Sequence, residues 1–202
     1  MHGGIAMNQH RHDTRPPGHV RIIGGRLRGS RLSVPAAPGL RPTPQRLRQS
    51  LFDWLAPVIA GARVLDAFAG TGALGIEALS RGAASAMFFE REPAQAAAIE
   101  ADLDRLHQAG AVRRTDTLRE LAAQEPHGRF DVVFVDPPFD AAAWGPTAAL
   151  LDANGWLADH AFVYVEQGNS DEWTPPARWG IHRSREAGAV RGTLFRIAAP
   201  EA

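Results

Sequence analysis

The sequence predicts an α/β fold in which a doubly wound, mostly parallel sheet ends in a C-terminal antiparallel pair and is preceded by an N-terminal basic β-hairpin. Between residues 62 and 166, short apolar runs alternate with segments of helical periodicity, which is typical of a parallel sheet. A glycine-rich turn follows the first apolar run, where such folds bind ligands. The last two strand-like segments have no helix between them, so they predict the antiparallel pair.

The composition fits one domain with a short N-terminal extension. The chain has 202 residues, of which 45% are hydrophobic, and this is enough for a core. It contains no Cys, which excludes disulfides and thiolate metal sites, and we expect no bound metal. There is no signal peptide and no apolar run long enough to span a bilayer, so we expect a cytoplasmic monomer that does not associate with membranes.

Positive charge is concentrated near the N-terminus. The formal net charge is zero, but residues 11–50 hold nine Arg and a single acid, Asp13. Such a cluster on an otherwise neutral chain favours a nucleic-acid partner over a merely solvated tail. The residues that we expect to contact this partner are Arg21, Arg26, Arg28, Arg41 and Thr43.

The N-terminal part divides into a tail and an extension. Residues 1–19 have no hydrophobic period and predict a disordered tail. In the extension, residues 20–44, two short strands are predicted around the Gly24-Gly25 break, followed by a proline-rich loop. Thr43 as N-cap and Pro44 at the first helical position then open a helix with Arg46 and Arg48 off its apolar face. The apolar face consists of Leu47, Leu51, Phe52 and Leu55.

The main domain, residues 45–202, carries the alternating elements. We predict strands at residues 62–66, 85–90, 112–116, 130–135 and 161–166. After the glycine-rich turn a helix ends at Ser80, and further helices are predicted at residues 93–109, 118–124 and 146–152. Residues 179–186 and 193–197 are predicted to form the closing antiparallel pair.

The glycine-rich turn predicts a nucleoside ligand. Gly70, Gly72 and Gly75 form a G-x-G-x-x-G pattern between strand and helix, which lets the backbone approach a ligand at a helix N-terminus. Glu90 follows Gly70 by 20 residues, at the end of the second strand, where a carboxylate accepts hydrogen bonds from both ribose hydroxyls. The alternative for Glu90 is an exposed acid at a strand end.

Asp66 narrows the choice of ligand. It ends the first strand, and three residues separate it from Gly70, so the loop is wider than one folded around a pyrophosphate. A carboxylate repels phosphates but suits an ammonium group, which favours S-adenosylmethionine over a dinucleotide. The predicted cofactor-binding residues are Asp66, Phe68, Gly70, Thr71, Gly72, Glu90 and Asp116. Phe68 alternatively only packs, and Asp116 alternatively caps the following helix.

The tetrapeptide Asp136-Pro137-Pro138-Phe139 closes the fourth strand. Two prolines lack backbone donors and fix φ, so the chain must leave the sheet in a stiff turn. The first and fourth strands are neighbours in a doubly wound sheet, so Gly70 and Asp136 are expected to share one crevice. The alternative is that Asp136 caps a turn and Phe139 packs.

This tetrapeptide resembles the [Asp/Asn]-Pro-Pro-aromatic motif of methyltransferases that modify exocyclic amino groups of bases. From about Val20 to Ile197, the chain also resembles the bacterial 16S ribosomal RNA guanine-N2 methyltransferases of the small subunit, although Gln45 and Gln49 stand where acids are expected. The segments that carry this resemblance are residues 21–25 (RIIGG), 39–43 (GLRPT), 51–55 (LFDWL), 68–82, 134–139 and 154–157.

The resemblance implies a Rossmann-like class I methyltransferase fold, with 16S rRNA, within a small-subunit particle, as the partner. It implies methyl transfer from S-adenosylmethionine to N2 of a guanine. Asp136 and the carbonyl of Pro137 would accept the amino protons, Pro138 would stiffen the turn, and Phe139 would stack on the base. Three alternatives stay open: an adenine-N6 methyltransferase acting on DNA or RNA, a non-catalytic RNA-binding assembly factor, and an NAD-dependent oxidoreductase.

Overall fold

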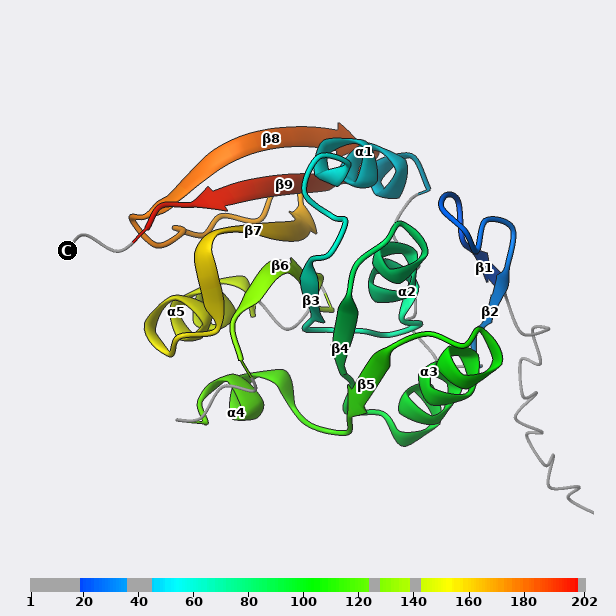
Figure 1. Ribbon diagram of the computed structural model, residues 1–202. Coiled ribbons are helices and arrows are strands. Elements are labelled where there is room, and N and C mark those ends of the chain that lie inside the picture. Colours follow the sequence, from blue (N-terminus) through cyan, green and yellow to red (C-terminus); the bar gives the residue numbers. More distant parts are fainter. Residues whose placement is uncertain (1–18, 36–44, 124–127, 139–142, 200–202) are drawn as a thin grey trace, which may run out of the picture.

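The structure is a computed structural model that describes residues 19–35, 45–123, 128–138 and 143–199 (Figure 1). Several predictions fall outside these ranges. They concern the tail up to residue 18, the domain boundary at residue 44, the loop that contains Arg41 and Thr43, and Phe139. His19, predicted as the last residue of the tail, belongs instead to a strand.

Seven strands form one mixed sheet in the order β5-β4-β3-β6-β7-β9-β8. The strands are β3 (Arg63–Asp66), β4 (Ser85–Phe89), β5 (Gly110–Arg113), β6 (Phe130–Val135), β7 (Leu157–Gly168), β8 (Trp179–Ala187) and β9 (Val190–Ile197). The first five pair in parallel, whereas β9 runs antiparallel to both β7 and β8. The predicted doubly wound sheet, its closing antiparallel pair and the pairing of β3 with β6 are therefore confirmed.

Helices cover both faces of this sheet and produce two core clusters (Figure 1). On one face lie α1 (Gln45–Leu55), α2 (Ala73–Ser80) and α3 (Pro93–Arg105), whose apolar side chains pack on Val132 and Phe134. On the other face lie α4 (Thr117–Leu121) and α5 (Trp144–Ala153), which pack on Val133 and Val135. The alternation along β6 thus places successive residues in opposite cores.

The N-terminal extension forms a separate antiparallel pair, β1 (His19–Arg21) and β2 (Arg31–Ser33), beside α2 and α3 (Figure 1). The predicted hairpin is present, but each strand has only three residues. Residues 22–30 leave the pair because they dock on α2, where Ile23 and Gly24 donate backbone hydrogen bonds to the Glu77 carboxylate at 2.8 Å each. Val20, Ile22 and Leu32 are buried in the same core as α1 and α2.

The prediction for Arg48 was wrong. It was placed off the apolar face of its helix, but its side chain is buried. Its Nη2 donates to the carbonyl oxygen of Arg21 at 2.7 Å, so the side chain crosses from α1 to the N-terminal extension. Burial lowers the Arg48 pKa, while the nearby charge of Glu77 opposes that shift.

Several predicted boundaries also require correction. The helix expected to reach Ala109 ends at Arg105, because His107 adopts a left-handed φ of 51° and the chain turns so that Gly110, the first residue of β5, pairs with Ala86 of β4. β5 consequently begins and ends earlier than predicted. α5 begins at Trp144 rather than residue 146. β7 begins at Leu157 rather than residue 161, because Leu157 already pairs with Phe130 ahead of an irregularity in the ladder.

Candidate functional site

Three carboxylates meet at the carboxyl edge of the sheet. Asp66 is the last residue of β3 and pairs with Phe88 on one side and Phe134 on the other. Glu90 and Asp136 each lie two residues beyond those partners, so the three acids end adjacent strands. The fold thus brings together three residues that are 20 or more positions apart in the chain.

Asp66 is almost fully buried at this edge. Its Oδ2 accepts a hydrogen bond from the backbone amide of Gly75 in α2 at 3.0 Å. Burial raises the Asp66 pKa to about 7; the Gly75 hydrogen bond opposes this shift, and the charges of Asp136 and Glu90 add to it. The carboxyl is therefore poised to change protonation near neutral pH, and a positive charge placed beside it would favour its ionised form.

The glycine-rich turn is fastened to both neighbouring strands. The amide of Ala67 donates to the Phe134 carbonyl, and that of Ala69 donates to the Phe89 carbonyl, each at 3.0 Å. Gly70 and Gly72 have φ values of 53° and 70°, in the left-handed region that glycine adopts most readily. Gly72 then starts α2 without a side-chain cap, which leaves the helix N-terminus with backbone donors.

Glu90 is integrated into this turn and is not the exposed strand-end acid that was the alternative. Only 8% of the residue is exposed. Its Oε2 accepts from the Gly70 amide at 2.7 Å, and its Oε1 accepts from the Glu92 amide at 2.8 Å. Burial is the main cause of a raised Glu90 pKa, and these two amides oppose it.

Gly75 has a packing function that its place in the glycine pattern did not reveal. A Cβ atom at this position would lie 2.2 Å from Cε1 of Phe88 in β4. The missing side chain therefore allows α2 to lie close against the sheet, whereas Gly70 and Gly72 shape the turn itself.

The other predicted cofactor residues have varied surroundings. Thr71 is buried in the turn. Phe68 is half-buried and packs against the core cluster around α4 and α5, which agrees with its packing alternative. Asp116 caps α4, since its Oδ1 accepts from the Arg119 amide at 3.0 Å, which is the alternative proposed for this residue.

The turn after β6 begins with a half-buried Asp136, followed by a buried Pro137 and an exposed Pro138. Beside it, β7 contributes Tyr164, whose hydroxyl donates to Glu166 Oε2 at 3.1 Å. Burial raises the Tyr164 pKa most, and the charges of Glu166 and Asp136 raise it further. Sequence reasoning missed Glu166, although it ends an apolar run in the same way as Asp66 and Glu90.

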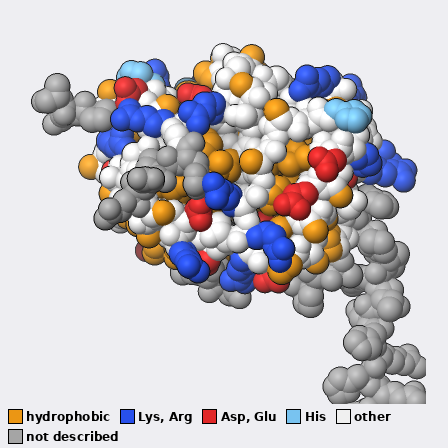
Figure 2. All heavy atoms as spheres, turned by 60° about the horizontal axis from the view of Figure 1, so that its bottom comes forward, with side chains coloured by type: hydrophobic (Ala, Val, Ile, Leu, Met, Phe, Trp, Pro, Cys, Tyr) orange, Lys and Arg blue, Asp and Glu red, His pale blue; other side chains and the backbone are white. Residues whose placement is uncertain are grey.

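Among the described basic residues of the N-terminal extension, Arg26 is held away from this edge. Arg26 donates from its Nη2 to Gln108 Oε1 at 2.8 Å and from its backbone amide to the Ser80 carbonyl at 2.9 Å. Because α2 and α3 lead back to the start of the next strand, their C-terminal ends lie at the edge opposite Asp136. Arg21, Arg26 and Arg28 are all exposed. Arginine side chains are also spread over the face in Figure 2, with acidic side chains among them.

Comparison with known proteins places this arrangement in a family. A family model described as conserved hypothetical protein 95 matches residues 20–196. The ribosomal RNA small subunit methyltransferase D of Escherichia coli K12 is 46% identical over 182 residues, covering 89% of this chain and 90% of that protein. The chain belongs to the family of these methyltransferases. The protein of the same name from Haemophilus influenzae is 38% identical over 185 residues, covering 89% of this chain and 94% of that protein.

Solved structures agree with the family assignment. A putative methyltransferase, yhhF, from Escherichia coli superposes with a TM-score of 0.82 and 44% sequence identity, covering 91% of this chain and 100% of that one. A Thermus thermophilus 16S rRNA N2 methyltransferase, solved with AdoMet and guanosine, has a TM-score of 0.68 at 18% identity. It covers 91% of this chain and 50% of that chain, and at this identity it shows the fold alone. The fold is that of class I methyltransferases.

Within the described ranges, no group of three or more His, Asp or Glu could hold a metal ion. Among the helices of the described part, none is long and apolar enough to cross a membrane.

Proposed function

We propose that this protein transfers a methyl group from S-adenosylmethionine to the exocyclic N2 amino group of a guanine in 16S rRNA. The observation that carries the proposal is the convergence of Asp66, Glu90 and Asp136 at one edge of a class I methyltransferase fold. The related proteins named as ribosomal RNA small subunit methyltransferases supply the class of nucleic acid.

The residues of the turn fit this cofactor. Glu90 has both oxygens next to the backbone of the turn and can still accept hydrogen bonds from ribose hydroxyls, because each carboxylate oxygen has two lone pairs. Asp66 and Asp136 suit a ligand with an ammonium and a sulfonium group, and they disfavour phosphates. When bound, S-adenosylmethionine supplies a sulfonium methyl group, whose S–C bond breaks toward sulfur as the N–C bond forms.

Asp136 and Pro137 would orient the target amino group. The lone pair of an exocyclic amine is delocalised into the ring, so hydrogen bonds from its protons to the Asp136 carboxylate and the Pro137 carbonyl favour the geometry of attack. The carboxylate also stabilises the positive charge that develops on nitrogen and can receive the proton that leaves. Phe139 is proposed to stack on the base, which must be presented unpaired.

The decisive experiment is mass spectrometry of 16S rRNA nucleosides from cells with and without the protein. We expect N2-methylguanosine to be lost at one position when the gene is deleted. Loss of N6-methyladenosine instead would identify the adenine alternative, and an unchanged nucleoside profile would contradict the proposed reaction.

A purified assay tests the residue assignment and the form of the substrate. Asp136→Ala should lose methylation by at least about a hundredfold, in line with other preorganised transition-state contacts, while it still binds the cofactor. Asp131→Asn, at the exposed start of the same strand, is the matched control and should remain active. Both are measured on protein-free 16S rRNA and on small-subunit particles, and we propose the particle as the better substrate.

A further inference from the structure

A cavity lies beside the turn that follows β6 and begins with Asp136, which is called the catalytic turn below. It has a volume of about 640 Å³ and lies between residues 171–175 and the strands β7, β8 and β9. The lining residues that matter here are Gln167, Trp173, Ile181, Arg191, Thr193 and Phe195. None of them belongs to the predicted cofactor or catalytic residues, and the proposed methyl transfer leaves the cavity without a function.

The wall of this cavity is held in place by hydrogen bonds. Gln167 is buried, and its Nε2 donates to the Asp171 carbonyl at 2.7 Å while its Oε1 accepts from the Trp173 indole at 2.6 Å. The indole also packs edge-on against Phe195, with ring centroids 5.9 Å apart. The cavity is therefore preformed and partly aromatic, as small-molecule sites usually are.

The cavity adjoins the catalytic turn through β7. Val135, the last residue of β6, pairs with Val165 in β7, and Gln167 lies two residues beyond Val165 in the same strand. The catalytic turn starts directly after Val135, so Gln167 and the cavity that it lines belong to the strand next to β6, about 4.8 Å away in the sheet. A nucleotide that neighbours a target at Asp136 is therefore within reach of this cavity.

The lining favours a flat, uncharged group. Ile181 is 69% exposed and, with Val58, is one of two exposed large hydrophobic residues in the described part of the chain. Charged residues of the lining are Asp171, Glu172 and Arg191, and the guanidinium of Arg191 is paired with Glu186 at 3.0 Å. Two acids against one paired arginine disfavour a phosphate, whereas aromatic and aliphatic surface suits a nucleobase.

We propose that this cavity binds the base of a nucleotide next to the target guanine. The inference rests on the proposed function and extends it, since a second anchored base would position the target amino group at Asp136. Ile181 and the aromatic wall provide the apolar contact surface. The carboxylates of Asp171 and Glu172 offer acceptors for the amino or imino protons of the base, with Asp171 Oδ2 also accepting from the Gly168 amide at 2.8 Å.

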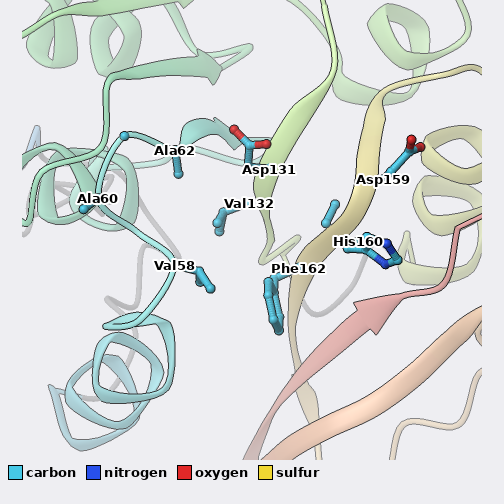
Figure 3. Close-up of a pocket in the computed structure, with 10 residues that line it drawn as sticks. Val58, Ala60, Ala62, Asp131, Val132, Asp159, His160 and Phe162 are labelled. Atoms are coloured by element: carbon cyan, nitrogen blue, oxygen red, sulfur yellow. The ribbon is translucent and has the colours of Figure 1, made fainter.

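A second pocket provides a matched control. It has a volume of about 350 Å³ and lies at the opposite edge of the sheet, where Val58, Ala62, Val132 and Phe162 line it (Figure 3). Ala62 precedes β3, and the other strand residues lie near the starts of β6 and β7. Val58 is the other exposed large hydrophobic residue of the described part, at 38% against 69% for Ile181, and it is remote from the catalytic turn.

The test compares Ile181→Ser with Val58→Ser on small-subunit particles that the wild-type protein methylates. Ile181→Ser should raise KM for the particle by about tenfold, consistent with the loss of one base contact, without changing cofactor affinity. Val58→Ser should match wild type, and Ile181→Leu should restore KM. Equal KM values for the two serine variants would overturn the proposal. If the wild-type protein does not methylate the particles at all, the proposed function itself is contradicted.

Crosslinking identifies the occupant. In particles that carry 4-thiouridine, ultraviolet light should join rRNA to a peptide containing Trp173, and Ile181→Ser should reduce that yield. Attachment of this peptide to a ribosomal protein alone, or no attachment, would overturn the assignment of an RNA base to the cavity.

Discussion

The backbone amide of Gly70 donates to Oε2 of Glu90 at 2.7 Å, so the residue expected to hold a ribose also holds the turn that shapes the cofactor site. The second oxygen of Glu90 accepts from Glu92. Both hydrogen bonds come from backbone amides of the protein, and they fix the orientation of the Glu90 carboxylate before a ligand binds. Preorganisation of this kind lowers the cost of ordering the site on binding.

Glu90→Ala is expected to weaken S-adenosylmethionine binding by roughly 10- to 100-fold, because it removes charge-assisted hydrogen bonds to the ligand and frees the Gly70 amide. Glu90→Gln should have a smaller effect, since its amide oxygen can keep one backbone contact. Isothermal titration calorimetry measures both. Glu92→Gln is the control, because the Glu92 side chain is 58% exposed, and an equal loss there would contradict a specific role for Glu90.

Asp66 should make the cofactor-free protein less stable as the pH rises. Its pKa is about 7 in the folded protein against an ordinary 3.8, so the folded state binds more protons between these values. The stabilisation from protonated Asp66 is complete below the ordinary pKa of 3.8, and it is lost as the pH rises through the folded-state pKa of about 7. Thermal unfolding at a series of pH values should show this decline, and Asp66→Asn should flatten it.

The affinity for S-adenosylmethionine should change with pH in the opposite direction to stability, through the same residue, Asp66. An ammonium group beside Asp66 favours the ionised carboxylate, so S-adenosylmethionine affinity should rise with pH up to about 7 and proton release should accompany binding below that pH. Calorimetry in buffers of different ionisation enthalpy measures the protons released. Unchanged release in Asp66→Asn would show that another group is responsible.

Glu77 should control how the N-terminal extension docks on the domain. Its carboxylate is fully buried and accepts from Ile23, Gly24 and Arg81. In Glu77→Gln an NH₂ group replaces one carboxylate oxygen and meets a backbone N–H donor that it cannot accept from. The free energy of unfolding should therefore fall by about 1–3 kcal/mol. Urea denaturation measures this loss, and hydrogen exchange should show faster exchange at the Ile23 and Gly24 amides. Glu100→Gln, on the exposed face of α3, should change stability little.

Local signals were sufficient for much of the fold. The run at 130–135 is bounded by Gly128 on one side and a double proline on the other, and β6 occupies the predicted residues. The acids Asp66, Glu90 and Asp136 were found because each ends an apolar run, which is itself a local feature. Glu166 carries the same signal, and it was overlooked because no ligand group was matched to it.

Contacts between distant segments could not be predicted in this way. The burial of Arg48 depends on the Arg21 carbonyl, 27 residues earlier, and on Glu77 nearby in space. Helical periodicity assigns an arginine to the solvent face, because it does not record an extension that covers that face. For the same reason the sequence indicated that Arg26 and Arg28 belong to a basic arm, but it did not place them at the edge away from Asp136.

Gly75→Ala provides a test of the close approach between α2 and β4. The added Cβ would lie 2.2 Å from the Phe88 ring, which is buried and cannot move away freely, so overpacking should cost about 1–3 kcal/mol despite the better helix propensity of Ala. Gly145→Ala is the control in α5, since its Cβ would meet no atom within 4 Å other than those of its chain neighbours. Pro146 follows Gly145 and restricts a residue with a Cβ at this position, which offsets the better helix propensity of Ala, so the control should change stability by less than about 1 kcal/mol. Urea denaturation compares the two, and because α2 also carries the amide that contacts Asp66, a shifted α2 in Gly75→Ala should weaken cofactor binding as well. Equal stability of the two variants would mean that α2 can move outward without loss, and that the third glycine of the pattern is not required for packing.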